Sequence, residues 1–350
     1  MAENLHFIKE TLRNRARQLG FQAVGFCDAQ VLERERDYLF ERGAGPFEPE
    51  DLPPRTDPRL LLGSARTVMS VGMSYLHSDP PKPDGLVGRL SKYCRGLDYH
   101  NLMLDRLEEI AREIRECYGA ESVAFVDTGP PLERAFAERS GIGRAGKNTN
   151  LIAPKLGSYL FLGVLVTELD LPPDEPAVYS ICGRCRLCID ACPTQCLDEW
   201  KLDSERCLGY LNQKYDDIPL EHREAMGDWI FGCDICQDVC PHNRKAPEGL
   251  VPEFAPLDKP GAFPDLLSLV SMSEQEFETW FGPTAADWRG SEAIRRNALV
   301  ALGNSGRDEA LEVVEPFTRS ENQVLAEHAT WAVTKLLEDK KKHPNRAEDD

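Results

Sequence analysis

Apolar side chains recur at the spacing of one helix face in two segments of the first 120 residues. Residues 4–19 place five apolar side chains on one face, and Gly20 follows at the point where a helix would end. A longer segment, from Asp98 to Tyr118, has the same spacing. Between these two predicted helices, continuous apolar runs that begin at Phe21 and Thr67 predict strands.

Strand and helix patterns continue to alternate up to residue 169. The short apolar segment Ser122–Asp127 predicts a strand that ends in an acidic residue, and Leu132–Arg139 predicts a helix. A glycine-rich loop follows, and the apolar segment 158–169 predicts another strand. Because such interleaving is typical of α/β and α+β domains, we predict an α+β fold with a mixed α/β domain at the N-terminus.

Proline-rich stretches divide the remainder of the chain. Pro172, Pro173 and Pro176 indicate a linker, and a second proline-rich stretch covers residues 246–264. Helical patterns near 291–304 and 322–338, with a third between them, share a spacing of small and apolar residues that is similar to that of HEAT-like repeats. We therefore predict four segments: the N-terminal domain (1–175), a ferredoxin-like cysteine-rich domain (176–245), a linker with α-helical HEAT-like repeats (246–340) and a disordered polar tail (341–350).

The charge balance and the cysteine content restrict the function. The net charge of −18 disfavours non-specific nucleic-acid binding, which depends on clustered basic residues, although a local basic patch remains compatible with it. The N-terminus lacks the apolar core of a signal peptide, and no apolar run approaches the ~18 residues that a membrane helix needs. We therefore expect a cytoplasmic protein without membrane contact. Nine of its twelve cysteines fall within 182–240, and in a reducing compartment such clustering indicates metal ligation.

The first cysteine motif, CGRCRLCIDACP, has the spacing C-x2-C-x2-C-x3-C-P. This is the spacing of bacterial ferredoxins, in which three closely spaced thiolates bind one 4Fe–4S cluster and the fourth binds a second cluster. A pair of CxxC elements can bind zinc instead, but the third close cysteine and the Cys192–Pro193 step favour the clusters. The four cysteines of this motif are Cys182, Cys185, Cys188 and Cys192.

The second motif, CDICQDVCP, has one cysteine fewer, because Val239 stands where a further thiol is expected. Two clusters need eight thiolates, and the two motifs supply seven. Cys207 is the better candidate for the eighth, whereas Cys196 is expected to be a buried free thiol. Crosswise ligation then predicts one cluster on Cys182, Cys185, Cys188 and Cys240, and the other on Cys192, Cys207, Cys233 and Cys236.

The glycine-rich segment 141–148, GIGRAGKN, nearly satisfies a phosphate-loop pattern, with Asn148 in place of the magnesium-binding hydroxyl. Such a loop should follow a strand and open a helix, whereas this one follows a predicted helix and leads into an apolar segment. We therefore do not predict nucleoside triphosphate binding. We expect the glycines to let the backbone approach another large ligand closely.

Several motifs, in order along nearly the whole chain, resemble the epoxyqueuosine reductase family. They are VDTGPPLERAFAERSGIGRAGKNTNLI, GSYLFLGVLVTEL, the two cysteine motifs, DYH at Asp98–His100 and WRG at Trp288–Gly290. The resemblance implies an oxidoreductase that converts epoxyqueuosine to queuosine in the anticodon loop of a tRNA. It also implies two 4Fe–4S clusters, an external electron donor and a cobalamin bound in the N-terminal domain. No Asp-x-His-x-x-Gly cobalamin-ligand motif occurs, which fits a base-off cofactor. We expect the protein to be a monomer.

The resemblance assigns the proton donor to Asp127. Converting an epoxide to an alkene takes two electrons and releases the oxygen as water, so a protonated acid must stand near the departing oxygen. We expect a flat corrin and apolar strands to raise the pKa of Asp127 by desolvation. From the residues alone, the commoner role for such an acid is in a turn or at a helix N-cap before Thr128.

Other family positions imply contacts with the corrin and the tRNA. Lys147 and Asn148 would hydrogen-bond the corrin amides or its phosphate, and Arg134 would face the pocket of Asp127 unless it is an ordinary surface charge. The expected cofactor contacts are Arg55, Ser91, Arg134, Lys147, Asn148 and Ser158. The residues that would meet tRNA phosphates, unless they are solvated helix residues, are Trp288, Arg289, Arg295 and Arg296.

Two other functions are compatible with the cysteine motifs. A ferredoxin-like electron-transfer protein would pass electrons to a docked partner, but an N-terminal section of about 170 residues is too large for a docking appendage and favours an enzyme. A reductive dehalogenase would combine cobalamin with two clusters and act on a small organohalide. Those enzymes are usually exported, and the N-terminus here shows no export signal.

Overall fold

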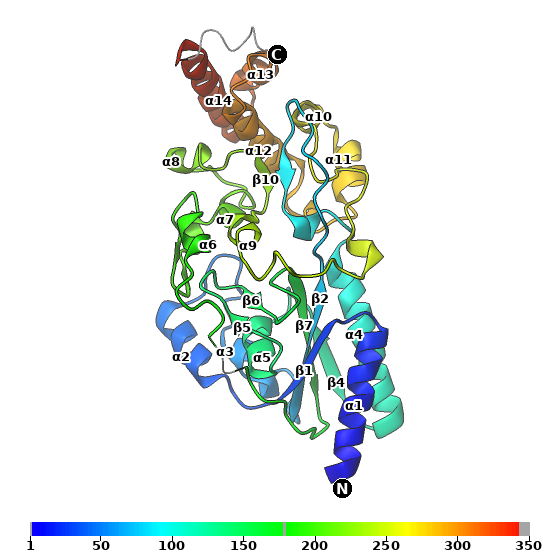
Figure 1. Ribbon diagram of the computed structural model, residues 1–350. Coiled ribbons are helices and arrows are strands. Elements are labelled where there is room, and N and C mark those ends of the chain that lie inside the picture. The colour runs from blue at the N-terminus through cyan, green and yellow to red at the C-terminus, as the bar shows by residue number, and fades with distance from the viewer. Residues whose placement is uncertain (1, 178–179, 343–350) are drawn as a thin grey trace.

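The computed structural model describes residues 2–177 and 180–342. Figure 1 shows an elongated molecule with a β-sheet near the N-terminal end and packed helices near the C-terminal end. The strands are β1 (Ala23–Asp28), β2 (Thr67–Ser74), β3 (Arg89–Leu90), β4 (Ser122–Phe125), β5 (Arg144–Ala145), β6 (Leu151–Ile152), β7 (Leu160–Thr167), β8 (Leu197–Asp198), β9 (Lys201–Leu202) and β10 (Trp229–Phe231).

Helices surround these strands and form the C-terminal end. The longer α-helices are α1 (Ala2–Gln18), α2 (Glu33–Arg42), α4 (Tyr99–Tyr118), α11 (Glu274–Phe281), α12 (Ser291–Asn304) and α14 (Gln323–Lys342). The shorter ones are α3 (Pro53–Thr56), α5 (Glu133–Arg139), α6 (Leu187–Asp190), α7 (Leu208–Leu211), α8 (Leu220–Arg223), α9 (Ile235–Asp238), α10 (Leu266–Ser271) and α13 (Glu309–Val314). The 3-10 turns are η1 (Pro58–Leu60), η2 (Lys92–Cys94), η3 (Ser204–Arg206), η4 (Pro252–Phe254), η5 (Asp287–Arg289) and η6 (Glu315–Arg319).

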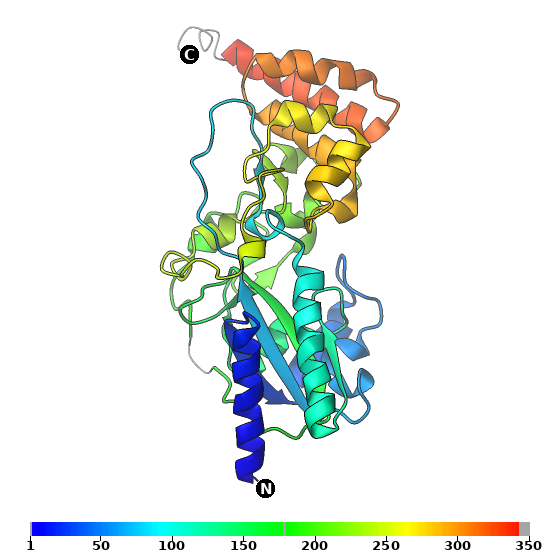
Figure 2. The same ribbon diagram turned by 90° about the vertical axis from the view of Figure 1, so that its right-hand side faces the viewer.

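A four-stranded antiparallel sheet, in the order β1-β2-β7-β4, organises the N-terminal part. Every residue of β2 is buried, as its continuous apolar run predicts for a central strand. Helices α1 and α4 cover one face of the sheet, as Figure 2 shows, and α5 packs on β1, β2 and β7. The predicted mixture of helices and strands is thereby confirmed, with antiparallel pairing throughout the sheet.

Helix α4 begins and ends where its sequence signals place it. The Asp98 carboxylate accepts a hydrogen bond from the backbone N–H of His100 (2.9 Å) and caps the N-terminus. Gly119 adopts a left-handed φ of 65° and ends the helix after Tyr118. This cap has a second consequence, because it fixes the backbone of His100 beside the loop that follows β4.

The predicted segments are not separate bodies with separate cores. Strand β3, from the N-terminal segment, pairs in parallel with β10, from the cysteine-rich segment. One continuous hydrophobic core runs from Ile8 in α1 to Leu336 in α14. The chain therefore passes back and forth between the predicted segments. As a result, cavities form where residues distant in the sequence meet.

The C-terminal helices confirm three predicted helical segments, but they move one boundary. Helix α14 continues through Lys342, so Lys341 and Lys342 do not belong to a disordered tail as predicted. Its last turns are held by a Lys335–Asp339 ion pair (3.0 Å) and by Lys340 against Asp308 (2.7 Å). Lysines at a helix C-terminus also interact favourably with the helix dipole. Residues 343–350 lie outside the described part of the chain.

Within residues 2–177 and 180–342, no helix combines the length and the apolar character that crossing a bilayer requires.

Candidate active site

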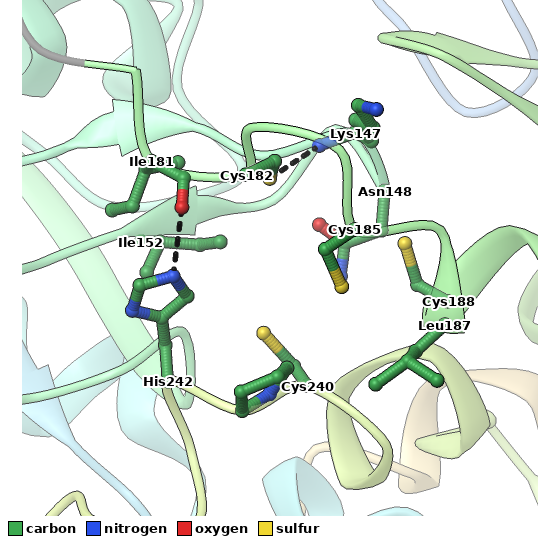
Figure 3. Close-up of a pocket in the computed structure, with 11 residues that line it drawn as sticks. Lys147, Asn148, Ile152, Ile181, Cys182, Cys185, Leu187, Cys188, Cys240 and His242 are labelled. Atoms are coloured by element: carbon green, nitrogen blue, oxygen red, sulfur yellow. Dashed lines mark hydrogen bonds between the residues drawn. The ribbon is translucent and has the colours of Figure 1, made fainter.

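The first group of cysteines lines a small pocket that Figure 3 shows in close-up. Cys182, Cys185 and Cys188 come from the first motif, and Cys240 comes from the second, as the crosswise prediction requires. The backbone N–H of Lys147 donates a hydrogen bond to the Cys182 sulfur (3.4 Å). The cavity measures about 40 Å³, which exceeds the space for one water-sized centre. Among the described residues, no three His, Cys, Asp or Glu side chains are close enough to hold a single metal ion.

The second group of cysteines lies next to the first. Burial raises the pKa of the Cys233 and Cys236 thiols, and neighbouring thiols, Cys192 among them, add to the rise. Cys207 lies within electrostatic range of both Cys233 and Cys236. These electrostatic influences place Cys192, Cys207, Cys233 and Cys236 near one another, as the motifs predict for one site.

Cys196 is buried, as predicted, but it also touches this second site. Its sulfur lies 3.4 Å from the sulfur of Cys192, and it shares a hydrogen bond with Cys207. The hydrogen bond with Cys196 lowers the pKa of Cys207 and the charges of Cys233 and Cys236 act to raise it, whereas the pKa of Cys196 responds mainly to Cys192 and Cys207. Cys196 therefore lies against both Cys192 and Cys207.

The β5–β6 hairpin separates the cysteine sites from a much larger space. The glycine-rich segment 141–148 contains strand β5 and enters the hairpin turn, residues 146–150. The next element is strand β6 and not a helix, so the phosphate-loop pattern is a coincidence of composition. A Cβ on Gly143 would lie 2.4 Å from the carbonyl oxygen of Ile152, and one on Gly141 would lie 2.5 Å from that of Glu175. These two glycines allow close packing of protein backbone, and not of a ligand as we predicted.

The hairpin turn also contacts the second cysteine motif. The Asn148 side chain donates to the carbonyl oxygen of Cys236 (3.4 Å), and the Asn150 amide lies 3.9 Å from the Cys236 sulfur. Asn150 additionally lines the large space on the other side. One side chain therefore touches both the second cysteine site and the large cavity.

This cavity has a volume of about 1300 Å³, which exceeds the ~300–1000 Å³ of ordinary ligand pockets. Its wall combines the loop after β4, the start of α4, the start of β7 and residues from the α2–α3 loop and η5. Phe161 stacks on Tyr99 in this wall, with ring centroids 3.8 Å apart. The predicted residues Asp127, Arg55 and Arg134 all line the cavity.

Asp127 lies at the cavity wall in a chain of hydrogen-bonded side chains. Its Oδ2 is 3.2 Å from Nε2 of His100, and Nδ1 of His100 is 2.6 Å from Oδ1 of Asp98. The Tyr99 hydroxyl also donates to Asp127. The Asp127 backbone has φ 49°, an uncommon conformation that asparagine and aspartate tolerate better than most residues. Its side chain is 61% exposed to the cavity.

The protonation states of Asp127 and His100 differ from what we predicted for Asp127. Burial raises the pKa of Asp127, but the hydrogen bond and charge of His100, with help from Tyr99 and Arg134, outweigh it and hold the pKa below its usual value. Burial lowers the pKa of His100, yet Asp127 and Asp98 raise it to about 9. Near neutral pH the proton therefore resides on His100, and Asp127 is an anion in contact with it.

A second acid in the cavity does carry a proton. Burial raises the pKa of Glu133 to about 8, and the neighbouring charge of Asp127 contributes to the rise. Its Oε1 and the Nε of Arg55 are buried without hydrogen-bond partners among the described residues. Unpaired buried polar atoms are uncommon in folded proteins. Two such atoms on one cavity wall fit a large ligand that carries its own donors and acceptors.

Comparisons with known proteins agree with this arrangement. The family model described as a 4Fe-4S double cluster binding domain matches residues 181–243. The model described as Epoxyqueuosine reductase QueG, DUF1730, matches residues 55–128, a range that includes Arg55, the Asp98–His100 motif and Asp127. The epoxyqueuosine reductase of Lactococcus garvieae is 37% identical over 97% of this chain and 99% of its own length. The chain belongs to the epoxyqueuosine reductase family.

Solved structures of epoxyqueuosine reductases share the whole fold. One that contains an epoxyqueuosine-modified tRNA-Tyr stem loop has a TM-score of 0.90 and 30% identity, and the match covers 99% of this chain and 96% of that one. Another, from Bacillus subtilis, has a TM-score of 0.89 and 29% identity, with 99% and 96% covered. In that structure the loop with the catalytic aspartate is swung out of the active site.

In this epoxyqueuosine reductase family member, four of the expected cofactor contacts lie away from the large cavity. Lys147 and Asn148 line the first cysteine pocket, and the ammonium of Lys147 pairs with Glu199 (2.7 Å). The Ser91 hydroxyl donates to Asp234. The Ser158 hydroxyl donates to Gln237 (2.8 Å), and its backbone N–H donates to Asn243 (2.7 Å). These four residues hold the cysteine segments against the N-terminal sheet.

Two of the arginines expected at tRNA phosphates are engaged inside the protein. Arg296 is almost fully buried and donates to the carbonyl oxygens of Lys214 (2.7 Å) and Asp216. Arg295 donates to the carbonyls of Val270 (3.0 Å) and Met272 (2.7 Å). The prediction of a phosphate contact is therefore wrong for the buried Arg296, because helix α12 turns it toward loops whose carbonyls need donors. For the half-buried Arg295 the phosphate contact stays a prediction.

Sequence reasoning missed His100 and Glu133 as functional candidates. His100 was part of a recognised motif, and its i+2 spacing from Asp98 at a helix start was a usable signal. Glu133 had no comparable signal, since one glutamate among many acidic residues gains its character only from burial in the cavity wall.

Proposed function

We propose that this chain reduces epoxyqueuosine to queuosine in the anticodon loop of a tRNA. The observation that carries the proposal is the link made by Asn150, whose amide lies 3.9 Å from the Cys236 sulfur while it also lines the cavity of Asp127. A redox centre on the second cysteine group would stand beside the place where the substrate is reduced. Membership of the epoxyqueuosine reductase family supports the choice of substrate.

The two cysteine groups are proposed to hold one 4Fe–4S cluster each. Cys182, Cys185, Cys188 and Cys240 would bind the first, and Cys192, Cys207, Cys233 and Cys236 the second. The electrostatic influence of Cys233 and Cys236 on Cys207 supports its choice over Cys196 as the eighth ligand. Clusters of this type transfer single electrons. The first cluster would accept electrons from an external donor and the second would pass them to the cavity.

The large cavity is proposed to hold a base-off cobalamin. Its volume and the unpaired Arg55 and Glu133 atoms suit a large cofactor with many amide groups. Arg55, Glu133 and Arg134 would bind it by hydrogen bonds. When bound, the corrin supplies a low-valent metal centre that can donate electrons to the epoxide. Lys147, Asn148, Ser91 and Ser158 would support the site indirectly, through the cysteine segments they hold.

The reaction determines what the protein groups must supply. Both carbon–oxygen bonds of the epoxide break, a carbon–carbon double bond forms, and the oxygen leaves as water after taking up two electrons and two protons. Asp127 is proposed to transfer both protons at its Oδ2. His100 supplies one proton at a time to Asp127 across the 3.2 Å contact and takes up another from solvent between the two transfers. Asp98 keeps His100 charged and oriented. A histidine with a pKa near 9 remains protonated throughout the neutral pH range and can therefore donate a proton there.

The remaining organisation of the chain follows the sequence-based proposal. Residues 1–175 would form the cobalamin-binding domain, 176–245 the ferredoxin-type domain and 246–342, with the boundary moved to the end of α14, a linker with HEAT-like helices. A cytoplasmic monomer that receives electrons from an external donor remains our proposal. The large cavity next to the cysteine sites favours this enzyme over a ferredoxin-like carrier, which needs no such space. The curated relatives that cover nearly the whole chain favour it over a dehalogenase.

The proposal is tested by anaerobic reconstitution with iron, sulfide and cobalamin, followed by a turnover assay. The substrate is tRNA that carries epoxyqueuosine, with a strong chemical reductant as electron source. We expect nucleoside mass spectrometry to show the loss of one oxygen atom. A protein that binds cobalamin but leaves the nucleoside unchanged would contradict the proposed substrate, and one that binds no cobalamin would contradict the proposed cofactor.

A further inference from the structure

An exposed group of aromatic side chains lies at the rim of the large cavity. Phe47 and Trp288 are 52% and 53% exposed, although both line the cavity. Their ring centroids are 5.3 Å apart at 82°, and Tyr210 approaches Phe47 at 4.9 Å. The guanidinium of Arg289 lies 3.6 Å from the Trp288 centroid and 4.6 Å from that of Phe47. We call Phe47, Tyr210, Trp288 and Arg289 the rim platform.

Three distant segments build this rim platform. Phe47 lies in the loop between α2 and α3, which rises from the N-terminal part in Figure 2, Tyr210 lies in α7, and Trp288 and Arg289 lie in η5. Phe47 has φ 61°, an unfavourable conformation for a bulky residue. The loop is held in place by Glu48, which accepts from the backbone N–H of Gly45 (2.6 Å) and pairs with Arg42 (2.7 Å). Strain of this kind persists where surrounding contacts over-determine the conformation, and it gathers at ligand-binding sites.

The rim platform also has an unused donor. The Nε of Arg289 is buried and has no hydrogen-bond partner among the described residues. The rim platform therefore combines exposed aromatic rings with a guanidinium whose Nε has no hydrogen-bond partner among the described residues. Such a combination is the usual means of binding an unpaired RNA base, which stacks on aromatic or guanidinium planes and uses its edge for hydrogen bonds.

We propose that the rim platform binds one unstacked base of the tRNA anticodon loop, next to the modified nucleotide that enters the cavity. The inference rests on the proposed function and names how the substrate docks. It also explains how a chain with a net charge of −18 binds RNA. Stacking needs no broad basic surface, and Arg289 places a single positive charge at the bound nucleotide.

The test measures the affinity of a labelled anticodon stem loop by fluorescence anisotropy. Trp288→Ala and Phe47→Ala are each expected to weaken binding about tenfold or more, whereas Trp288→Phe, which keeps an aromatic face, retains most of it. Phe7→Ala removes a ring that is 69% exposed on α1, far along the sequence from the rim platform, and serves as the matched control with unchanged affinity. Iron content and thermal melting of each variant establish that it is folded.

Stem loops with an abasic site at each loop position in turn identify the bound base. One position should weaken wild-type binding about as much as Trp288→Ala does, and the two changes together should weaken it little further, because both remove the same contact. Independent effects that multiply would overturn the proposal, as would full affinity of Trp288→Ala. A wild-type enzyme that neither binds the stem loop nor converts epoxyqueuosine would instead contradict the proposed function.

Discussion

The first cysteine pocket and the large cavity are built from the chain in opposite ways. The pocket takes three of its four thiols from the short segment 182–188. The cavity takes its lining from residues between Phe47 and Trp288, with each segment contributing only a few side chains. In the pocket, residue type and spacing specify the chemistry. In the cavity, the pKa of an acidic residue depends on its neighbours. The pKa of Asp127 is lowered, whereas that of Glu133 is raised.

The contrast between the two sites shows which properties of a residue can be predicted without knowing its neighbours in the fold. A cysteine in a C-x2-C-x2-C run is a cluster ligand almost wherever the run occurs, because the ligand spacing is local. A carboxylate becomes an acid or a base according to burial and hydrogen bonding. Glu133 lacks a partner at Oε1 and keeps its proton, whereas His100 stabilises the charged form of Asp127.

The largest effect is expected from Asp127→Asn, which tests the cavity. An amide cannot pass a proton from His100 to the leaving oxygen, so turnover should fall on the order of 10²–10⁴-fold while cluster and cobalamin contents stay unchanged. Single-turnover assays with mass spectrometry measure the first quantity, and absorption spectra the second. Asp105→Asn, an exposed acid on α4, is the control. Full activity of Asp127→Asn would mean that the proton comes from another group, with Glu133 the first to examine.

The second-largest effect is expected at the cysteine sites, where the removal of one thiol ligand should cause the loss of a whole cluster. Cys207→Ala is expected to lower the iron content from about eight toward about four atoms per chain, and to abolish turnover, because the second cluster loses a ligand. Cys196→Ala should keep both clusters. Iron analysis and electron paramagnetic resonance distinguish the two. The reverse result would mean that Cys196 is the eighth cluster ligand, and its sulfur lies 3.4 Å from that of Cys192.

A smaller effect is expected from the pH dependence of the His100–Asp127 pair. The pKa of His100 is raised from 6.5 to about 9, so the pair stabilises the fold fully below pH 6.5 and loses this contribution as the pH rises through about 9. Turnover should decline over the same upper range, as the proton reservoir empties. His100→Gln should lower turnover about tenfold at pH 7 and remove this decline. A rate profile that is identical in the variant and the wild type would show that His100 does not feed Asp127.

The smallest effect tests how the hairpin joins the two regions. A methyl group at Gly143 would lie 2.4 Å from a backbone oxygen of Ile152, so Gly143→Ala must displace the β5–β6 hairpin. We expect a loss of about 1–3 kcal/mol in the free energy of unfolding, and partial loss of iron from the first cluster. Denaturant titration and iron analysis provide the measurements. Gly63→Ala adds its methyl group to open space and is the matched control. Unchanged iron in Gly143→Ala would mean that the hairpin does not support the cluster.

Much of the fold was predictable because its signals are local. The apolar runs of β2 and β7 and the helical spacing of α4 give the right elements, and Asp98 and Gly119 mark the ends of α4. The pairing of β3 with β10 was not predictable, since two-residue strands have no periodicity of their own. The end of α14 was also missed, because polar residues at a helix terminus resemble a disordered tail until ion pairs with neighbouring helices are known.

The sequence alone determined the metal chemistry of this protein and its membership of a redox family. Cysteine spacing is set by the reach of a few consecutive residues, so the two motifs indicate iron–sulfur ligation without reference to the rest of the fold. The tertiary structure decided the proton chemistry: it placed His100 against Asp127, left Oε1 of Glu133 without a hydrogen-bond partner among the described residues, and drew Arg296 away from the surface into a buried network. The reason is electrostatic, since the pKa of a side chain depends on desolvation and on charges that distant segments bring within a few ångströms.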